Sequence, residues 1–210
     1  MLHVDHVIYG TRDIDAAAGR LWEEHGLASV VGGRHRAWGT ENRIVPLGDA
    51  YLELMTVFDA ELAARTQLGR FVAQRIARGD GFLGWMAAGE GFEERAAALG
   101  VEPMSFGRQR PDGSEVRWRL AGLETMITQP PLPGLLAWDD PDAFPGHTPV
   151  EHPGVTPRGF AWLELAGDEQ RLRDWIGEDA GLPLRVLEGD PPGVRAAAIA
   201  LDDGGEIVIR

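Results

Sequence analysis

The sequence predicts an α+β fold built from a repeated strand–helix–strand–strand–strand order (βαβββ). Runs that alternate between apolar and polar residues, as half-buried strands do, recur in groups of four. In each group, a segment with apolar residues at helical spacing follows the first strand. The order occurs three times in the 210 residues, although the copies have little sequence in common. We therefore expect modules over residues 1–57, 80–140 and 158–210.

The first module shows the order most clearly. LHVDHVIYG alternates as a strand does, and TRDIDAAAGRLWEEHGL has a helical apolar stripe with Asp13 or Thr11 as its N-cap and Gly26 as its stop. ASVVGG and NRIVPLG are short apolar runs that predict strands. YLELMTV is the last strand, and it follows a hairpin turn at Gly48 and Asp49.

The remaining elements follow the same reasoning. Residues 58–79 predict one connecting helix that ends at Gly79. The second module is predicted as GFLGWMAAG, EGFEERAAALG, VEPMSFGRQ, SEVRWRLAG and GLLAWDD, with a turn at 111–113. Residues 141–157 contain five prolines and no periodicity, so they predict a linker. The third module is predicted as FAWLELAG, DEQRLRDWIGEDAGL, LPLRVLEG, VRAAAIALDD and GEIVIR.

Composition excludes several classes of function. The formal net charge of -13 argues against nucleic acid and anionic membrane surfaces as partners, because both require a basic face. The chain has no cysteine, and all 20 basic residues are arginine, which excludes disulfides, thiolate chemistry and lysine Schiff bases. No signal peptide or membrane-spanning run is present, so we expect a cytoplasmic protein.

Three segments are the most specific part of the sequence pattern: DHVIYGTRDIDAAAGRL, GGRHRAWGTENRIVPLGDAYLELM and GDGFLGWMAAGEGFEERAAALG. With these segments and the repeated βαβββ order, the chain resembles the glyoxalase-like branch of the vicinal oxygen chelate superfamily. The resemblance implies that modules one and two pair edge to edge, forming one curved sheet around a cleft. The third is then an appended half-module. Its open apolar face must pack on the other modules or on a second copy of the chain, as in a homodimer.

The resemblance also implies a divalent metal in the cleft, such as Fe, Mn, Zn or Ni. Each module would give one ligand from its first strand and one from its last. In the first module the matching residues are His6 and Glu53, and by alternation His6 shares a face with Val4 and Ile8. In the second module Trp85 and Ala137 stand at these places, and neither side chain binds metal. Two of the four ligands therefore remain.

Three roles are open for His6 and Glu53. With His35 as a third ligand, they would form a two-histidine, one-carboxylate metal site. Without metal, they could be a buried hydrogen-bonded pair, because polar groups buried among apolar residues must be paired. As a metal-free catalytic pair, Glu53 would be the general base and His6 would orient it.

The segment GRHRAWGTENR, residues 33–43, predicts a loop between the second and third strands that the resemblance places at the cleft mouth. Its candidate binding residues are Arg34, Arg36, Trp38 and Asn42. The planar guanidinium group of arginine suits a carboxylate or phosphate, and a tryptophan offers a flat apolar face to a ring. An asparagine side chain both donates and accepts hydrogen bonds. In the alternative interpretation, the arginines pair with surface carboxylates and the tryptophan fills the core.

Trp85 and Trp138 would make the far half of the cleft apolar, either stacking a ligand or filling the cavity. Two functions are compatible with these candidate residues. The first is an enzyme of lyase, isomerase or dioxygenase type, with His6, Glu53 and His35 as catalytic residues. Its substrate would be a small, anionic and partly aromatic molecule bound between modules one and two. The alternative is a metal-free protein that binds a drug or metabolite and sequesters it without catalysis.

Overall fold

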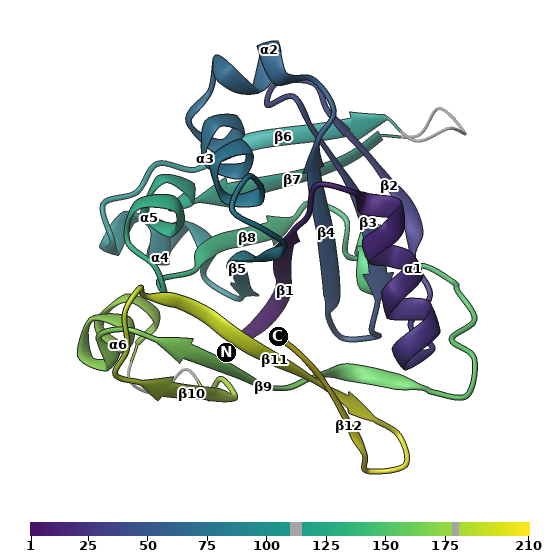
Figure 1. Ribbon diagram of the computed structural model, residues 1–210. Coiled ribbons are helices and arrows are strands. Elements are labelled where there is room, and N and C mark those ends of the chain that lie inside the picture. The colour runs from purple at the N-terminus through teal and green to yellow at the C-terminus, as the bar shows by residue number, and fades with distance from the viewer. Residues whose placement is uncertain (110–114, 178–180) are drawn as a thin grey trace.

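The computed structural model describes residues 1–109, 115–177 and 181–210 (Figure 1). The first module forms the elements β1 (Leu2–Gly10), α1 (Ile14–His25), β2 (Val30–His35), β3 (Thr40–Pro46) and β4 (Tyr51–Val57). The second forms β5 (Gly81–Gly89), α4 (Phe92–Ala98), β6 (Met104–Gln109), β7 (Glu115–Ala121), α5 (Leu123–Thr128) and β8 (Gly134–Trp138). The predicted turn at 111–113 lies outside the described residues.

The first two modules form one strongly curved, eight-stranded sheet. Its order is β2-β3-β4-β1-β5-β8-β7-β6, so each module contributes four neighbouring strands. In each module the first strand pairs in parallel with the last, and the two first strands, β1 and β5, pair antiparallel at the centre. The edge-to-edge pairing expected from the resemblance is therefore confirmed, and it creates a concave face to which both modules contribute.

The third module forms a separate sheet with a different pairing order. Its elements are β9 (Pro157–Ala166), α6 (Glu169–Ile176), β10 (Leu184–Leu187), β11 (Gly193–Leu201) and β12 (Glu206–Ile209). The order along the chain is the predicted one, but the strands pair as β10-β9-β11-β12, so here the second strand is the parallel neighbour of the first. The predicted helix ran further, and residues 178–180 of it lie outside the described part of the chain.

The apolar face of this small sheet is covered by the same chain. Leu163, Leu165 and Ile199 belong to one buried cluster with Val7 and Trp85 of the large sheet. Figure 1 shows the small sheet lying across the lower side of the large one, with β11 beside β5, and the two strands make contacts. The open face that the sequence predicts is thus buried between the modules.

The connecting segment is two helices instead of one. These are α2 (Ala60–Ala64) and α3 (Gln67–Ile76), separated because the Thr66 side chain accepts a hydrogen bond from the Gly69 amide and caps the second helix. The buried side chains Leu68, Val72 and Ile76 of α3 pack with residues of the concave face. Helix α5, which the sequence pattern did not predict, adds Met126 to the same cluster.

The proline-rich segment is held against the first module. It contains two short 3₁₀ helices, η1 (Pro141–Ala143) and η2 (Pro145–His147). Beyond them, the Ala28 amide donates to His152 Nδ1 at 3.0 Å, and His152 Nε2 lies 2.8 Å from the Pro46 carbonyl oxygen. Partial burial lowers the pKa of His152 below its ordinary value, although the hydrogen bond to Pro46 opposes this. The neutral imidazole therefore joins the linker to the segment between α1 and β2 and to the end of β3.

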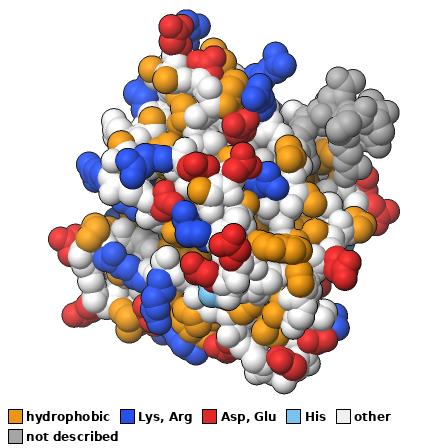
Figure 2. Space-filling view, turned by 45° about the vertical axis from the view of Figure 1, so that its right-hand side comes forward, with side chains coloured by type: hydrophobic (Ala, Val, Ile, Leu, Met, Phe, Trp, Pro, Cys, Tyr) orange, Lys and Arg blue, Asp and Glu red, His pale blue; other side chains and the backbone are white. Residues whose placement is uncertain are grey.

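The molecular surface carries mixed charge. Figure 2 shows acidic and basic side chains interspersed on one face, with hydrophobic side chains between them. In the described part of the chain, none of the helices is long and apolar enough to cross a membrane.

Candidate functional site

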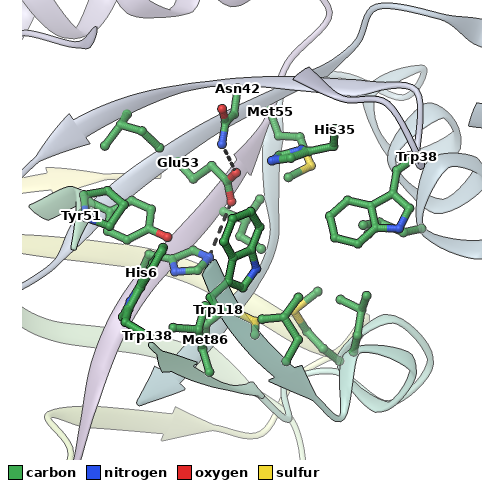
Figure 3. Close-up of a pocket in the computed structure, with 18 of the residues that line it drawn as sticks. His6, His35, Trp38, Asn42, Tyr51, Glu53, Met55, Met86, Trp118 and Trp138 are labelled. Carbon is green, nitrogen blue, oxygen red and sulfur yellow. Dashed lines mark hydrogen bonds and ion pairs between the residues drawn. The ribbon is translucent and has the colours of Figure 1, made fainter. Parts of the chain in front are cut away.

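A pocket of ≈ 80 Å³ opens on the concave face, between modules one and two. Figure 3 shows side chains from both halves of the sheet pointing into it. An engineered apolar cavity of about 150 Å³ holds a benzene molecule, so this pocket has room for a small group or for one end of a larger ligand. Its lining residues are His6, Ile8, His35, Trp38, Asn42, Ile44, Tyr51, Glu53, Met55, Leu68, Met86, Val116, Trp118, Leu120, Leu123, Met126, Leu136, Trp138 and Pro145.

An irregularity in β1 determines which of its side chains enter the pocket. The pairing of β1 with β5 shifts register between Val4 and His6, as at a β-bulge. Val4 therefore packs in the cluster on the outer face of the sheet with Val7, whereas His6 and Ile8 line the pocket. The expectation that Val4 shares a face with His6 is wrong, because the extra residue, Asp5, interrupts the alternation.

Four polar side chains form a connected group at the pocket, called here the polar cluster: Asp5, His6, Glu53 and Asn42. Asp5 Oδ1 lies 2.6 Å from His6 Nδ1, and His6 Nε2 lies 3.5 Å from Glu53 Oε2. The Asn42 amide nitrogen donates to the other carboxylate oxygen, Glu53 Oε1, at 2.5 Å. Asp5 is 0% exposed, and His6 and Glu53 are each 5% exposed. Two carboxylates are therefore buried around one imidazole.

The backbone of β2 holds Asn42 in place. The Gly33 amide donates to Asn42 Oδ1 at 2.8 Å, which leaves the Asn42 amide nitrogen directed at Glu53. A Cβ at the preceding Gly32 would lie 2.1 Å from Asn42 Oδ1, so only glycine allows this approach. The glycines of the GGRH segment thus contribute to the orientation of Glu53.

Aromatic rings form a second part of the pocket wall, beside aliphatic and methionine side chains. Eight rings follow one another in a chain of contacts from His6 to His35, with centroid distances between 4.4 Å for the first pair and 6.2 Å for the widest. This aromatic belt consists of His6, Tyr51, Phe144, Trp138, Trp118, Phe106, Trp38 and His35. Six of its members line the pocket, and Phe106 and Phe144 connect them. Trp138 also joins the belt to the polar cluster, because its Nε1 donates to Asp5 Oδ2 at 2.9 Å.

Residues 33–43 are mostly strand, not loop. They form the β2–β3 hairpin, and only 36–39 are a turn. Because side chains alternate along β2, His35 points into the pocket and its neighbours point away. Arg34 is 61% exposed and pairs with Glu41 at 2.9 Å, and Arg36 is exposed outside the pocket lining.

The candidate binding residues of this hairpin are therefore divided. Trp38 and Asn42 line the pocket, as does His35, while Arg34 and Arg36 do not. The two arginines were the basis for expecting an anionic ligand. With both on the outer surface, the geometry does not support that expectation.

The two candidate tryptophans of module two are also divided. Trp138 lines the pocket, but Trp85 is completely buried on the opposite face, where its Nε1 donates to the Pro131 carbonyl oxygen at 2.8 Å. In the pairing of β1 with β5, the residue opposite His6 is Met86, which follows Trp85 directly in the chain. Leu136 lies on β8 at the place that Glu53 has on β4. Met86 and Leu136, not Trp85 and Ala137, are thus the pocket-lining counterparts of His6 and Glu53.

The donor set does not fit the divalent metal that the superfamily resemblance implies. A catalytic metal site ordinarily needs three protein ligands or more. Module two offers a thioether and a leucine at the matching places, and Glu53 Oε1 is already bound by Asn42. In the described ranges, no three histidine or acidic side chains come together in an arrangement that could hold a metal, so His35 does not complete a triad with His6 and Glu53.

Sequence reasoning missed Asp5 and Trp118. Asp5 had a detectable signal, because a carboxylate beside a histidine inside an apolar strand must be paired or functional. Trp118 had none, since the run EVRWRLA does not show which face of β7 is concave. The methionines Met55, Met86 and Met126 were not distinguishable from ordinary core residues.

Comparisons with known proteins agree with this fold. The family model described as a glyoxalase-like domain matches residues 4–178. The crystal structure of a hypothetical protein from Staphylococcus aureus aligns over 100% of this chain and 99% of that chain, with 16% identity and a TM-score of 0.70. No curated protein matches the chain.

Structures of methylmalonyl-CoA epimerase match a smaller part. The enzyme from Mycobacterium tuberculosis covers 63% of this chain and 85% of its own, with 18% identity and a TM-score of 0.45. A variant of the Streptomyces coelicolor enzyme, in complex with 2-nitronate-propionyl-CoA, covers 63% and 92%, with 17% identity and a TM-score of 0.46. The Staphylococcus aureus structure shows that the fold, including the third module, recurs elsewhere, and the epimerase scores are too low to support a functional argument.

Proposed function

Since the chain belongs to the family of glyoxalase-like domains, within the vicinal oxygen chelate superfamily, we propose that its pocket binds a small, partly aromatic molecule and moves a proton on it without a metal ion. The reaction class is that of an isomerase or lyase acting next to a carbonyl group. His6 and Glu53 are the acid–base pair, Asp5 and Asn42 position them, and the aromatic belt binds the ligand.

The burial of the polar cluster carries this proposal. Removing carboxylates from water costs several kcal/mol per ion unless close partners compensate, and an apolar pair of similar volume is often at least as stable. A protein that needed only an apolar pocket would not require Asp5, His6 and Glu53 at its floor. Groups buried and held this way are typical of sites that transfer protons.

The geometry assigns a role to each group. Glu53, with Oε1 held by Asn42, has Oε2 on the side of His6 and is placed to accept a proton from a carbon atom of the ligand. His6, whose Nδ1 is held by Asp5, can donate from Nε2 to the carbonyl oxygen as negative charge develops there. In an isomerisation, Glu53 then returns its proton to a different carbon while the oxygen gives its proton back to His6, which restores the carbonyl group. In an elimination, the leaving group departs with its bonding electrons and takes up the proton from Glu53, and the oxygen again returns its proton to His6.

Deuterium exchange tests this function directly. The wild-type protein and a Glu53→Gln variant would be incubated in D₂O with phenylacetone, phenylpyruvate and a trimethylammonium-bearing acetophenone, and loss of the proton next to the carbonyl followed by NMR. We expect the wild type to accelerate exchange of at least one compound, and Glu53→Gln to lose that acceleration by roughly 100-fold or more. Exchange at the buffer rate for all three would contradict the proposal.

Binding without catalysis is the second candidate, and the aromatic belt favours it. Three tryptophans in one small pocket provide a large apolar surface that can hold a ring without reacting with it. This function predicts that ligand binding survives in Glu53→Gln and that no compound of the panel exchanges. The exchange experiment therefore separates the two candidates.

A further inference from the structure

We propose that the ligand of this pocket carries a positive charge, as an alkylated ammonium group, and that this charge lies where related folds would hold a metal ion. The inference rests on the proposed function only in using the same pocket. It names the substrate class: a small organic cation with an apolar or aromatic portion.

The charges around the pocket favour a cation. Glu53 lines it, and Asp5 lies directly behind His6. Among the residues that the structure describes, no arginine lines the pocket, and the chain has no lysine, so the positive charge available there is limited to two imidazoles, His6 and His35. An anionic ligand would meet two carboxylates in a water-poor setting, where repulsion is strong. A cationic ligand would instead compensate the buried carboxylates.

The wall favours the same class of ligand. The faces of aromatic rings carry partial negative charge and attract cations, and cages of tryptophan and tyrosine recognise quaternary ammonium groups in this way. Trp38, Trp118, Trp138 and Tyr51 all line the pocket, and their contacts run through Phe106 and Phe144. Figure 3 shows Tyr51, Trp138 and Trp118 near His6 and Glu53, with Trp38 on the far side of the pocket beyond His35.

The module-two side of the pocket explains why an alkylated cation fits better than a metal ion. Met86 and Leu136 line the pocket there, beside Met126 of α5. A bare metal ion would find no oxygen or nitrogen donors on this side, but the methyl groups of an ammonium can pack against thioethers and leucine. The ligand would thus have its charge against Glu53 and its alkyl groups against module two.

Three probes that differ mainly in charge test the inference. Choline, its neutral isostere 3,3-dimethylbutan-1-ol and the anion 3,3-dimethylbutanoate have closely similar shapes, and their binding can be followed by tryptophan fluorescence and by calorimetry. We expect choline to bind roughly 5- to 30-fold more tightly than the neutral isostere, and the anion to bind most weakly.

Variants test the two sources of this preference. Glu53→Gln keeps the shape of the side chain and removes its charge, so choline affinity should fall roughly tenfold while the neutral isostere is unaffected. Trp118→Leu should reduce the preference for choline over its isostere. Glu61→Gln is the matched control, because it removes one carboxylate from an exposed position outside the pocket lining.

The inference is overturned if the neutral isostere or the anion binds as tightly as choline. Absence of choline binding at about 10 mM, which corresponds to less than roughly 3 kcal/mol of affinity, overturns it as well. These results are independent of the exchange assay. Exchange of phenylacetone without choline binding would support the proposed proton transfer and contradict the cationic ligand. Choline binding without exchange of any compound would support the cationic ligand and contradict the proton transfer.

Discussion

The indole Nε1 of Trp138 donates a hydrogen bond to Asp5 Oδ2 at 2.9 Å, although the two residues are 133 positions apart. The bond joins the last strand of module two to the first strand of module one. Because Asp5 Oδ1 also contacts His6 Nδ1, one carboxylate positions both a ring of the pocket wall and the imidazole of the polar cluster. The pocket therefore depends on both modules at once.

Trp138→Phe should remove that hydrogen bond and leave the completely buried Asp5 with one partner fewer. We expect the free energy of unfolding to fall by ~1–3 kcal/mol, the usual cost of an unsatisfied buried group. Urea denaturation measures it. Trp118→Phe is the control, since it removes an indole from the same wall without touching Asp5. Equal losses for the two variants would show that the bond to Asp5 adds nothing.

Trp85→Phe should affect stability but not ligand binding. Trp85 is completely buried on the outer face, and its Nε1 donates to the Pro131 carbonyl oxygen. Loss of this bond and of part of the ring should cost ~1–3 kcal/mol in denaturation experiments. A pocket ligand identified by the choline series should bind with unchanged affinity. Weaker binding by the folded variant would place Trp85 functionally in the pocket after all.

Two residues of the β2–β3 turn, Trp38 and Arg36, should differ in their effect on ligand binding. Trp38→Ala should weaken ligand binding roughly 2- to 12-fold, through the loss of one aromatic contact. Its stability cost should be below the ~3–5 kcal/mol of a fully buried aromatic, because Trp38 is only partly buried. Arg36→Ala, two residues away and exposed, should change neither quantity by more than ~0.5 kcal/mol. A large stability loss in Trp38→Ala with unchanged binding would make this side chain a structural one.

His152 should make stability depend on pH. Its pKa is lowered by burial, so the unfolded chain binds a proton at this residue more readily than the folded protein does. Stability from His152 is therefore present above its unfolded pKa of about 6.5 and is lost as pH falls below that value. Protonation would also prevent Nδ1 from accepting the Ala28 hydrogen bond.

The variant His152→Ala tests this pH dependence. We expect a loss of ~1–3 kcal/mol near pH 8 and a smaller loss near pH 5, because the wild type has by then lost part of the contribution. His3→Ala, at an exposed position, is the control and should show no such difference. A loss for His152→Ala that is the same at both pH values would contradict the account.

Much of the fold follows from local patterns in the sequence. The apolar stripe of α1, its Asp13 cap and its Gly26 stop all lie where the residues indicate. The break between α2 and α3 was missed because Thr66 lies inside a continuous apolar periodicity and acts only through its cap. The pairing order of the third module has no local signal, because the alternation of a strand does not specify which strand lies beside it.

Most of the pocket-lining candidates that the sequence indicates lie in module one, and in module two Trp138 is the one that lines the pocket. His6, Glu53, Asn42 and Trp38 all line the pocket, and each is a polar or aromatic residue in a place where sequence makes it conspicuous. Arg34 faces outward because side chains alternate along β2, and Arg36 is exposed in the turn, so the chemistry of an arginine does not by itself place it in the pocket. In β5 a one-residue difference in register exchanges Trp85 for Met86, and the sequence pattern alone does not fix that register.

Proton exchange in the presence of a chelator tests the central claim most directly, namely that His6 and Glu53 transfer protons and do not hold a metal. The rate of deuterium incorporation into the active compound of the panel would be measured with and without EDTA, for the wild type and for Glu53→Gln. The account predicts a wild-type rate that EDTA leaves unchanged and a rate at the buffer level for Glu53→Gln. Exchange that EDTA abolishes and added Mn²⁺ or Ni²⁺ restores would contradict it, because His6 and Glu53 would then act as metal ligands.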